Sequence, residues 1–321
     1  MRSILEILAQ GGQVSGEEIS RELGISRAAV WKKIEALREA GWQIESAGKL
    51  GYRLEPGDRL EPVLWESKLE TSRLGRGEIA YHDTVDSTNT QLKIMAAKGA
   101  PDGSVCLCEC QNGGKGRLGR SWNSPAGQGI WVSLLLRPQL RPEHAPLLTL
   151  CTAMAMNRAI RETTGADSRI KWPNDIICGG KKLCGILLEI SADMDHIDYV
   201  VIGTGLNVYP GAYPEELKHQ ATSLQEVGKV QSRAEILIHY LRALEEYAAL
   251  LEQKGFAGIA DAYRAQSCTL GSRVNVIGSI NMTGTAEDID ETGALLVRDD
   301  SGELHRVLAG DVSVRGVMGY V

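Results

Sequence analysis

The first 54 residues are divided by serines and glycines into three short helical segments and an alternating stretch, and this order leaves few folds open. An apolar helix pattern covers residues 4–8 and ends at a pair of glycines. A second helix is predicted between Ser15, which can cap its first turn, and Gly24, which ends it. A third begins at Ser26 and carries an inward apolar stripe. This spacing is typical of a helix-turn-helix.

The stretch after Gly41 alternates as two short strands around Ala47-Gly48-Lys49, which predicts a hairpin wing. Between Ser26 and Arg53 the chain carries three acidic residues and six basic ones, namely Arg27, Lys32, Lys33, Arg38, Lys49 and Arg53. The basic excess lies on the elements that would face a DNA groove and its phosphates. We therefore predict a DNA-binding domain that makes contact through Ser26, Arg27, Lys32, Lys33 and Lys49. A small helical interaction domain with solvated charges is the alternative.

The chain is long enough for two or three domains, because 321 residues exceed the usual size of one core. Pro56-Gly57-Asp58 and Pro62 mark a linker. We expect a DNA-binding domain at residues 1–60, a central domain at 61–269 and a C-terminal domain at 270–321. The formal net charge of -6 gives no overall attraction to polyanions, so a nucleic-acid surface must be local.

The amino-terminal stretch and the cysteines both indicate a cytoplasmic protein with no membrane partner. Residues 1–10 have Glu6 inside their apolar pattern and no small-residue cleavage site, and no run approaches the length of a membrane span. Seven cysteines in a chain of this length are not a disulfide scaffold. Cys106, Cys108 and Cys110 alternate along one expected strand, and neighbours on one strand face do not wrap a tetrahedral metal ion. A metal site at this trio is therefore the weaker interpretation.

A loop rich in glycine and cations follows the strand predicted at 105–110. It reads Gln-Asn-Gly-Gly-Lys-Gly-Arg-Leu-Gly-Arg-Ser-Trp over residues 111–122. Its glycines give it no fixed shape, and a buried core would reject Lys115, Arg117 and Arg120. Such a loop suits a flexible lid over an anion.

The same loop contains Gly114, Gly116 and Gly119 in the spacing of a dinucleotide-binding fingerprint. That fingerprint requires a helix to start within it, whereas residues 122–127 contain Pro125 and cannot continue one. A P-loop is also absent, because no Lys-Ser or Lys-Thr follows a GxxxxG at the required place. Neither nucleotide motif explains the loop.

Together with four other motifs, the loop resembles the ordered signature of biotin protein ligases. The four are Asp86-Ser87-Thr88-Asn89, Lys171-Trp172-Pro173-Asn174-Asp175, Lys182-Leu183-Cys184-Gly185-Ile186-Leu187 and Gly203-Thr204-Gly205-Leu206-Asn207-Val208. With the winged helix in front, the chain resembles the bacterial bifunctional ligase and biotin-operon repressor from end to end. The family loop usually reads GRGR, so Lys115 keeps the charge but gives up a planar bidentate fork.

The resemblance implies an α+β multidomain fold: a winged helix-turn-helix, a class II synthetase-like α/β ligase domain and an SH3-like β-barrel. The barrel also follows from alternating patterns at 273–277, 282–289, 294–299, 304–308 and 312–314. The resemblance suggests that this domain helps to place ATP and the acceptor through Asp311 and Arg315, with simple capping of the sheet as the alternative. In the central domain, helices are predicted from Pro146 to Ile160 and from Ser232, paired with Glu235 as a cap, to Gly255.

The family's chemistry implies a role for each motif. The catalytic residues would be Arg117, Lys182 and Arg120. Biotin would be bound by Ser87, Thr88, Asn89, Gln111, Gly114, Lys115, Gly116, Arg117, Trp122, Lys182 and Gly185. The nucleotide would be bound by Arg117, Arg120, Trp122, Asn174, Asp175, Lys182 and Asn207. Asp175 could also engage a metal ion, and residues 209–224 would form a second loop that closes on adenine.

The resemblance further implies ATP and Mg²⁺ as cofactors, biotin as substrate, and biotinyl-5'-AMP as intermediate and corepressor. The implied partners are the biotin carboxyl carrier protein of acetyl-CoA carboxylase, other biotin-dependent carboxylases, operator DNA, and a second copy of the chain when the adenylate is bound. Two rival interpretations remain: a transcription factor that senses biotin without chemistry, and a lipoate-type ligase of the same fold. The cations of the loop and Lys182 argue against a sensor, which needs no grip on a triphosphate.

Overall fold

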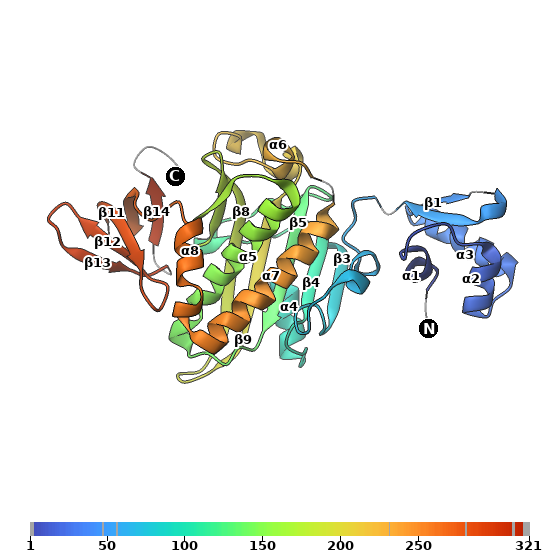
Figure 1. Ribbon diagram of the computed structural model, residues 1–321, viewed down its shortest axis with the longest axis horizontal. Helices are drawn as coiled ribbons and strands as arrows, with labels where there is room; N and C mark the ends of the chain where they lie inside the picture. The colour runs from blue at the N-terminus through green and yellow to red at the C-terminus, as the bar shows by residue number, and fades with distance from the viewer. Residues whose placement is uncertain are drawn as a thin grey trace. The chain divides into compact units, whose positions relative to one another are not determined.

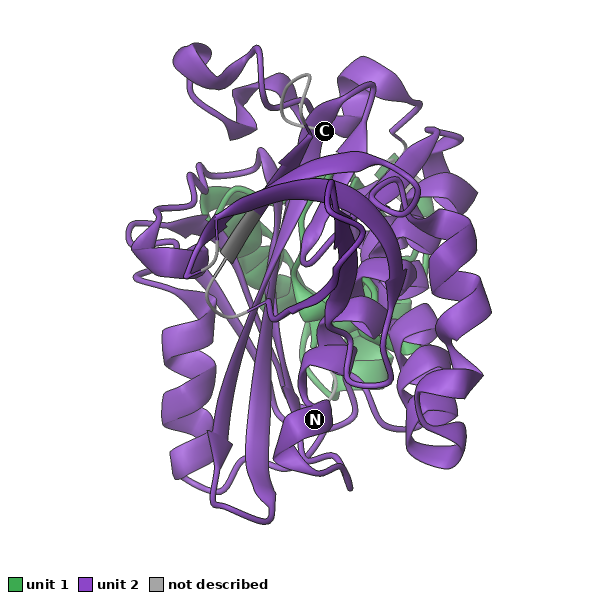
Figure 2. Ribbon diagram, turned by 90° about the vertical axis from the view of Figure 1, so that its left-hand side faces the viewer, with its two compact units in different colours: residues 1–68 green, residues 69–321 purple. Residues whose placement is uncertain are grey.

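The computed structural model describes residues 3–46, 48–55, 57–230, 232–279, 281–309 and 312–316 (Figure 1). The chain divides into two compact units, Met1–Lys68 and Leu69–Val321, which Figure 2 distinguishes by colour. No helix among the described residues has the length and apolar character needed to cross a membrane.

The amino-terminal unit is a winged helix-turn-helix, as predicted. Its elements are α1 Ile4–Leu8, α2 Gly16–Leu23, α3 Arg27–Glu39 and the antiparallel strands β1 Gln43–Ser46 and β2 Tyr52–Glu55. Ser15 and Glu18 form the predicted capping box, with the Ser15 hydroxyl 3.1 Å from the Glu18 N–H that it caps. Gly24 ends α2 at a φ of 64°, a conformation that glycine adopts without strain. The unit buries its own apolar cluster, which includes Ile19, Val30 and Ile34.

A seven-stranded sheet forms the centre of the second unit. In spatial order its strands are β3 Ile79–Val85, β4 Val105–Gln111, β5 Gly129–Leu136, β9 Ile197–Asn207, β8 Lys181–Ala192, β7 Asp175–Cys178 and β6 Ser168–Lys171. Only the β3–β4 pair is parallel, and the other five pairs are antiparallel. The sheet is therefore mixed, as in the class II synthetase-like fold rather than in a doubly wound one.

Helices cover both faces of this sheet. α4 Thr88–Ala97 packs on one face, and α5 Pro146–Thr164 and α7 Arg233–Lys254 pack on the other. The shorter helices are α6 Leu224–Val227 and α8 Ala260–Gln266, of which α8 packs against α5. Two neighbours on β9 mark the two faces: an added Cβ on Gly203 would meet Asn89 of α4, whereas the Thr204 hydroxyl lies 2.9 Å from that of Tyr240 on α7. Figure 1 shows α5 and α7 side by side. The candidate functional site described below lies on the face of the sheet that α4 covers.

The predicted cap of α7 is wrong in one respect. Ser232 occupies the N-cap position, but its side chain makes no capping hydrogen bond. The first residue of the helix anchors this end instead. Arg233 is buried, pairs with Glu109 at 2.9 Å and donates a hydrogen bond to the Gly129 carbonyl at 2.8 Å. A buried ion pair to the sheet thus replaces a local cap that the sequence pattern favoured.

The C-terminal strands form a separate five-stranded antiparallel sheet. They are β10 Arg273–Gly278, β11 Met282–Ile289, β12 Leu295–Asp299, β13 Leu304–Val307 and β14 Val312–Gly316, in the order β13-β12-β11-β10-β14. The five predicted strands are therefore confirmed. Trp172 joins this sheet to the central one, because its indole N–H donates to the Gly293 carbonyl at 3.0 Å.

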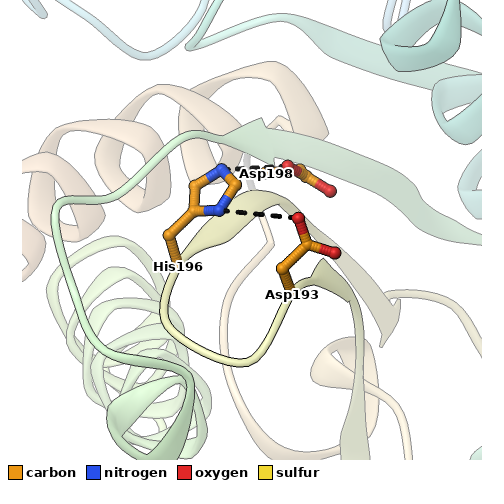
Figure 3. A group of neighbouring side chains, drawn as sticks. All are labelled: Asp193, His196 and Asp198. Carbon is orange, nitrogen blue, oxygen red and sulfur yellow. Dashed lines mark ion pairs between the residues drawn. The ribbon is translucent and has the colours of Figure 1, made fainter.

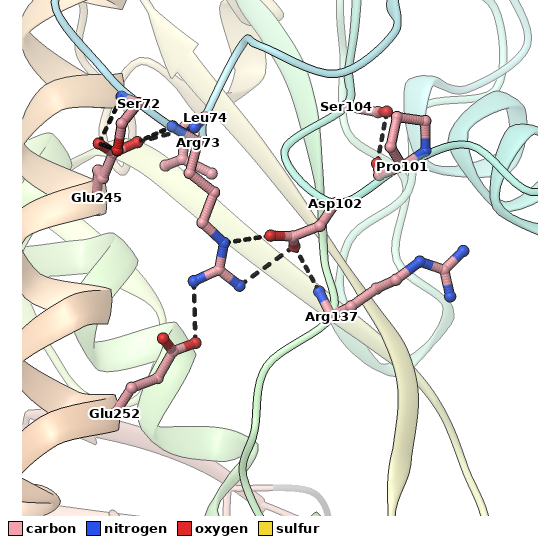
Figure 4. A network of polar contacts seen from close by, with 9 residues as sticks. All are labelled: Ser72, Arg73, Leu74, Pro101, Asp102, Ser104, Arg137, Glu245 and Glu252. Carbon is pink, nitrogen blue, oxygen red and sulfur yellow. Dashed lines mark hydrogen bonds and ion pairs between the residues drawn. The ribbon is translucent and has the colours of Figure 1, made fainter.

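The segment that enters the second unit is held by one carboxylate of α7. Glu245 accepts hydrogen bonds from the backbone N–H groups of Ser72, Arg73 and Leu74 at 2.7–2.8 Å (Figure 4). The Arg73 side chain also pairs with Asp102 and with Glu252. Burial alone would raise the pKa of Glu245, but the three backbone donors lower it below its ordinary value.

We expect Glu245→Gln to lower the free energy of unfolding at pH 7 by about 1–3 kcal/mol, because hydrogen bonds to a charged acceptor are lost. Since the folded-state pKa is depressed, this stabilisation is present above the unfolded pKa and disappears as the pH falls through the folded one. Urea unfolding at pH 7 and at lower pH checks both points. Glu246→Gln is the matched control, because the Glu246 carboxylate is about half exposed and pairs with Arg158. An equal loss in both variants would contradict this account.

Candidate functional site

A cavity of about 270 Å³ opens on the α4 face of the central sheet, under the loop at 112–124 and the loop at 209–224. It brings together residues from five motifs that lie far apart in the sequence. The predicted site residues that line it are Ser87, Thr88, Asn89, Gln111, Lys115, Gly116, Arg117, Arg120, Trp122, Asn174, Asp175, Lys182, Gly185 and Asn207. Gly114 alone among the predicted ligand contacts does not line it. A side chain there would lie 2.3 Å from the Trp122 carbonyl oxygen, so Gly114 allows the loop to fold back on itself.

The floor of the cavity is backbone, because β8 and β9 carry glycine on this face. Gly185 and Gly205 are paired across the two strands, and the Trp122 ring lies over both. An added Cβ on Gly205 would be 2.4 Å from the Trp122 Nε1, and one on Gly185 would be 2.9 Å from the same ring. The Trp122 Nε1 is buried and has no hydrogen-bond partner among the described residues. It is a donor that a ligand acceptor would satisfy.

One end of the cavity is a network of neutral polar side chains at the start of α4. The Gln111 carbonyl oxygen accepts from the Thr88 N–H at 2.9 Å, and its amide donates to Ser124 at 2.8 Å. The Ser133 hydroxyl contacts Thr88 at 2.7 Å and Asn89 at 2.5 Å. These bonds fix the rotamers of several neutral donors and acceptors, and behind them the Asn89 amide donates to the Glu189 carboxylate, which pairs with Lys93. Such an end suits a neutral ring with a donor and acceptor edge.

The other end is crowded with cations. Lys182 Nζ lies 2.6 Å from an oxygen of Asp175 and 5.1 Å from the centre of the Trp122 ring. Arg117 donates to Asn174 at 3.0 Å, and burial lowers its pKa although Asp175 opposes that shift. Lys171 is only 5% exposed, and burial lowers its pKa to about 8. Three cations therefore surround one carboxylate, and the excess charge favours an anionic ligand.

The loop at 209–224 is tied to Lys182, one of the residues that carry this charge. The backbone of Lys182 donates to the Gln220 carbonyl at 2.7 Å and accepts from the Thr222 N–H at 2.9 Å. Asn207, predicted to contact nucleotide, donates its amide to the Thr222 carbonyl at 3.1 Å. In the structure Asn207 thus holds the 209–224 loop as well as lining the cavity.

The C-terminal sheet reaches the cavity. Val314 and Arg315 line it, and Arg117 donates a hydrogen bond to the Ala309 carbonyl. Arg315 therefore lies where a contact to ligand is feasible, whereas Asp311, the other residue proposed for this domain, lies outside the described residues.

Asp175 is the predicted metal residue, and in the structure its partner is an ammonium group. Among the described residues, the groupings compact enough for an ion lie elsewhere, at Asp193, His196 and Asp198 and at Asp299, Glu303 and His305. Figure 3 shows His196 between the two aspartates, at 3.0 Å from Asp198 and 3.9 Å from Asp193. All three side chains are exposed, with Asp193 and His196 in the connection between β8 and β9 and Asp198 at the start of β9, outside the cavity lining. Exposed ion pairs explain this group without a metal.

The predicted DNA-contacting residues fall into two sets. Arg27, Lys32 and Lys33 are exposed on α3, and Ser26 caps that helix through the Ala29 N–H at 3.2 Å. The side chain of Lys49 lies outside the described part of the chain.

Two of the basic residues counted in the sequence serve the fold instead. Arg38 donates to the Ile44 carbonyl at 2.9 and 2.6 Å, and Arg53 pairs with Glu45 and Glu55. Fewer basic side chains are therefore available to contact DNA than the six counted in the sequence.

Sequence reasoning missed several residues of the cavity. Lys171 lines the cavity but was not predicted as a site residue. Its position at the end of the apolar strand β6, opposite Asp175, would have indicated this role. Asn123, Tyr213, Leu217, Gln220 and Ala221 also line the cavity. They lie in the two loops, whose folded path is set by contacts that a local pattern does not contain.

Comparisons with known proteins agree with the motifs. Family models match residues 81–207 (Biotin/lipoate A/B protein ligase family), 1–53 (HTH domain) and 269–315 (Biotin protein ligase C terminal domain). The Bifunctional ligase/repressor BirA of Bacillus subtilis is 36% identical over 322 residues, covering 98% of both chains. The protein of the same name from Escherichia coli is 31% identical over 315 residues, covering 97% of this chain and 96% of its own.

The structure also resembles solved ligases. The biotin protein ligase from Aquifex aeolicus, solved in complex with biotin and ATP, has a TM-score of 0.64 and 30% identity, covering 74% of this chain and 99% of its own. The fold class and the family inferred from the sequence motifs are thus confirmed. From its amino-terminal HTH domain to its C-terminal sheet, the chain belongs to the family of bifunctional biotin protein ligases and repressors.

Proposed function

We propose that this protein activates biotin with ATP as biotinyl-5'-AMP and transfers the biotin to a lysine of a biotin carboxyl carrier protein. We further propose that the adenylate-bound dimer represses biotin genes by binding operator DNA. The observation that carries the ligase proposal is the cluster of Lys171, Lys182 and Arg117 around a single carboxylate, beside a neutral polar pocket. The two ends fit a triphosphate and a ureido ring. The proposal places the activity in the cytoplasm.

In the first step the carboxylate of biotin attacks the α-phosphate of ATP, and pyrophosphate leaves. The protein contributes position and charge: Arg117, Arg120 and Lys182 would hold the carboxylate and the phosphoryl oxygens, with Lys115 assisting from the loop. Trp122 would cover the ligand and donate its unpartnered N–H. In the second step the amine of the acceptor lysine attacks the acyl carbon, and AMP leaves.

Mg²⁺ would neutralise the phosphates. Asp175 is the carboxylate nearest the cations of the cavity, and Mg²⁺ commonly uses one or two carboxylates together with substrate phosphates. Asp175 therefore fits as one ligand, provided that Lys182 moves from it to a phosphoryl oxygen. Asn174 and Asn207 would line the nucleotide.

Two other functions would use the same fold. A biotin sensor without chemistry would have little use for three cations around one carboxylate. A lipoate-type ligase would bind a dithiolane ring, which has no donors or acceptors to match the polar side chains of Gln111, Thr88 and Ser133 at this end of the cavity. Incubation with ATP, Mg²⁺ and either biotin or lipoate separates these cases through pyrophosphate release and detection of the adenylate by mass spectrometry.

We expect Lys182→Ala to keep the fold and to slow adenylation by at least about a hundredfold, because a preorganised charge at the reacting phosphate is lost. Arg117→Ala should act similarly. Pyrophosphate release is the readout. Lys181→Ala is the matched control. The Lys181 ammonium group donates to the Lys218 carbonyl outside the cavity lining, so adenylation by this variant should stay near the wild-type rate. Equal rates for Lys181→Ala and Lys182→Ala would refute the assignment.

The three-domain division at 1–60, 61–269 and 270–321 is part of the proposal. The amino-terminal unit has its own apolar cluster, which extends to Leu64, so Lys68 is the better point for a truncation. We expect removal of residues 1–68 to preserve biotinylation of carrier protein and to abolish operator binding. Western blotting with streptavidin and gel-shift assays measure the two activities. A truncated protein that still shifts operator DNA would locate the DNA site elsewhere.

Repression should depend on the adenylate. One winged helix makes few base contacts, and pairing two copies on two half-sites raises affinity. A ligand that fixes the 112–124 and 209–224 loops lowers the entropic cost of a dimer contact beside them. We expect biotinyl-5'-AMP to promote dimerisation and operator binding more than biotin does, and operator DNA to tighten adenylate retention by the same factor. Sedimentation and DNA titrations test this, and equal results in all ligand states would disprove the coupling.

A further inference from the structure

Trp31 is a large aromatic side chain left exposed on α3, the second helix of the helix-turn-helix. It is 55% exposed, whereas the other five tryptophans, all within the described residues, are buried or partly buried. Single exposed apolar residues are common and carry little meaning alone. The position of Trp31 gives it meaning, because it lies in the first two turns of the helix that enters the major groove in this class of domain.

The neighbours of Trp31 define the surface to which it belongs. Val30 and Ile34 turn into the core, and Arg27, one turn before Trp31, is exposed on the same side of the helix. Arg38 lies two turns after Trp31 on this side and is bonded to the Ile44 carbonyl and the Ser46 hydroxyl of β1. The edge of α3 that carries Trp31 is thus the edge that the wing holds.

The exposed part of α3 combines this aromatic edge with charge. Lys32 and Lys33 lie farther round the helix from Trp31, by about 100° and 200°, and supply exposed positive charge that binds phosphates without regard to sequence. Sequence is read by hydrogen bonds and apolar contacts to base edges, and the apolar feature of the major groove is the C5-methyl group of thymine. Ala28 is also exposed but is too short to reach far from the helix. Trp31 is the exposed side chain in the first two turns of α3 with the reach and apolar area for such a contact.

We propose that Trp31 determines operator specificity by packing against thymine methyl groups in the major groove, while Lys32 and Lys33 provide the sequence-independent attraction. This inference rests on the proposed operator binding. A second copy of the chain could also cover an exposed tryptophan. DNA carries far denser negative charge than a second copy of this chain with its net charge of -6, so the basic side chains of α3 favour DNA, and the test separates the two occupants.

The probe is a duplex selected from a random-sequence pool by the full-length protein in the presence of biotin, ATP and Mg²⁺. Each thymine of a half-site is then replaced in turn by uracil, which removes only the C5-methyl group. We expect at least one replacement to weaken wild-type binding by about fivefold or more, in line with the cost of losing one base contact. If no thymine in either half-site responds, the proposal is overturned whatever the variants do.

The variant Trp31→Ala should bind the selected duplex about tenfold more weakly per half-site. Its binding to unselected DNA and its salt dependence should be unchanged, because no phosphate contact is removed. The uracil replacement that weakens wild-type binding should have no further effect in Trp31→Ala. Trp31→Phe should retain part of the discrimination, because it keeps an aromatic ring.

Lys33→Ala is the contrasting control. It should weaken binding to all sequences alike and reduce the slope of log affinity against log salt by about one. Biotinylation activity, circular dichroism and melting temperature should match wild type in all three variants, which shows that the fold is intact.

Two results would overturn the assignment of Trp31: equal sequence discrimination by wild type and Trp31→Ala, or weaker dimerisation of Trp31→Ala without DNA, which would assign Trp31 to a contact between copies. If the wild-type protein selects no sequence from the pool, the proposed repressor function has failed instead. These outcomes are distinct, because the first two require a wild-type protein that binds its selected duplex.

Discussion

The absence of side chains on one face of β8 and β9 is the constraint on which the site depends. Gly185, Gly203 and Gly205 leave bare backbone on this face, and Trp122 and Asn89 approach this backbone more closely than any Cβ would allow. The cavity therefore exists because the sheet is thin at this point. An alanine at Gly205 would meet the indole ring at 2.4 Å and force the 112–124 loop outward.

Electrostatics follows from this geometry. Arg117 from the loop, Lys171 from β6 and Lys182 from β8 converge on Asp175 beside this floor, although like charges repel and burial lowers the pKa of Arg117 and of Lys171. This cluster of charges is unfavourable by itself, so favourable packing elsewhere in the unit must offset its free-energy cost. The neutral network of Gln111, Thr88 and Ser133 at the opposite end carries no such strain. The site is thus polarised along its length, as a ligand with an anionic and a neutral end requires.

Sequence patterns predicted the elements whose causes are local. The capping box of Ser15, the end of α2 at Gly24 and the five C-terminal strands depend on neighbouring residues, and each was found. Predictions from local sequence patterns failed where contacts with residues distant in the sequence determine the structure. The loss of the Ser232 cap depends on a buried pair between Arg233 and Glu109. The structural use of Arg38 depends on a strand that a charge count does not consider. Motifs identified most of the site because each loop carries its chemistry within a few residues, although the exclusion of Gly114 needed the folded loop.

Lys182 connects the cavity to the loop at 209–224. Its ammonium group faces Asp175 inside the cavity, while its backbone pairs with Gln220 and Thr222 of the neighbouring loop. A displacement of that loop therefore shifts the ammonium group, and a pull on the ammonium group strains the loop. The position of the ammonium group and the position of the loop are therefore coupled through one residue. The cation that faces the ligand and the loop that borders the cavity thus share one residue, so the 209–224 loop is joined through a single backbone segment to the charge at the centre of the site.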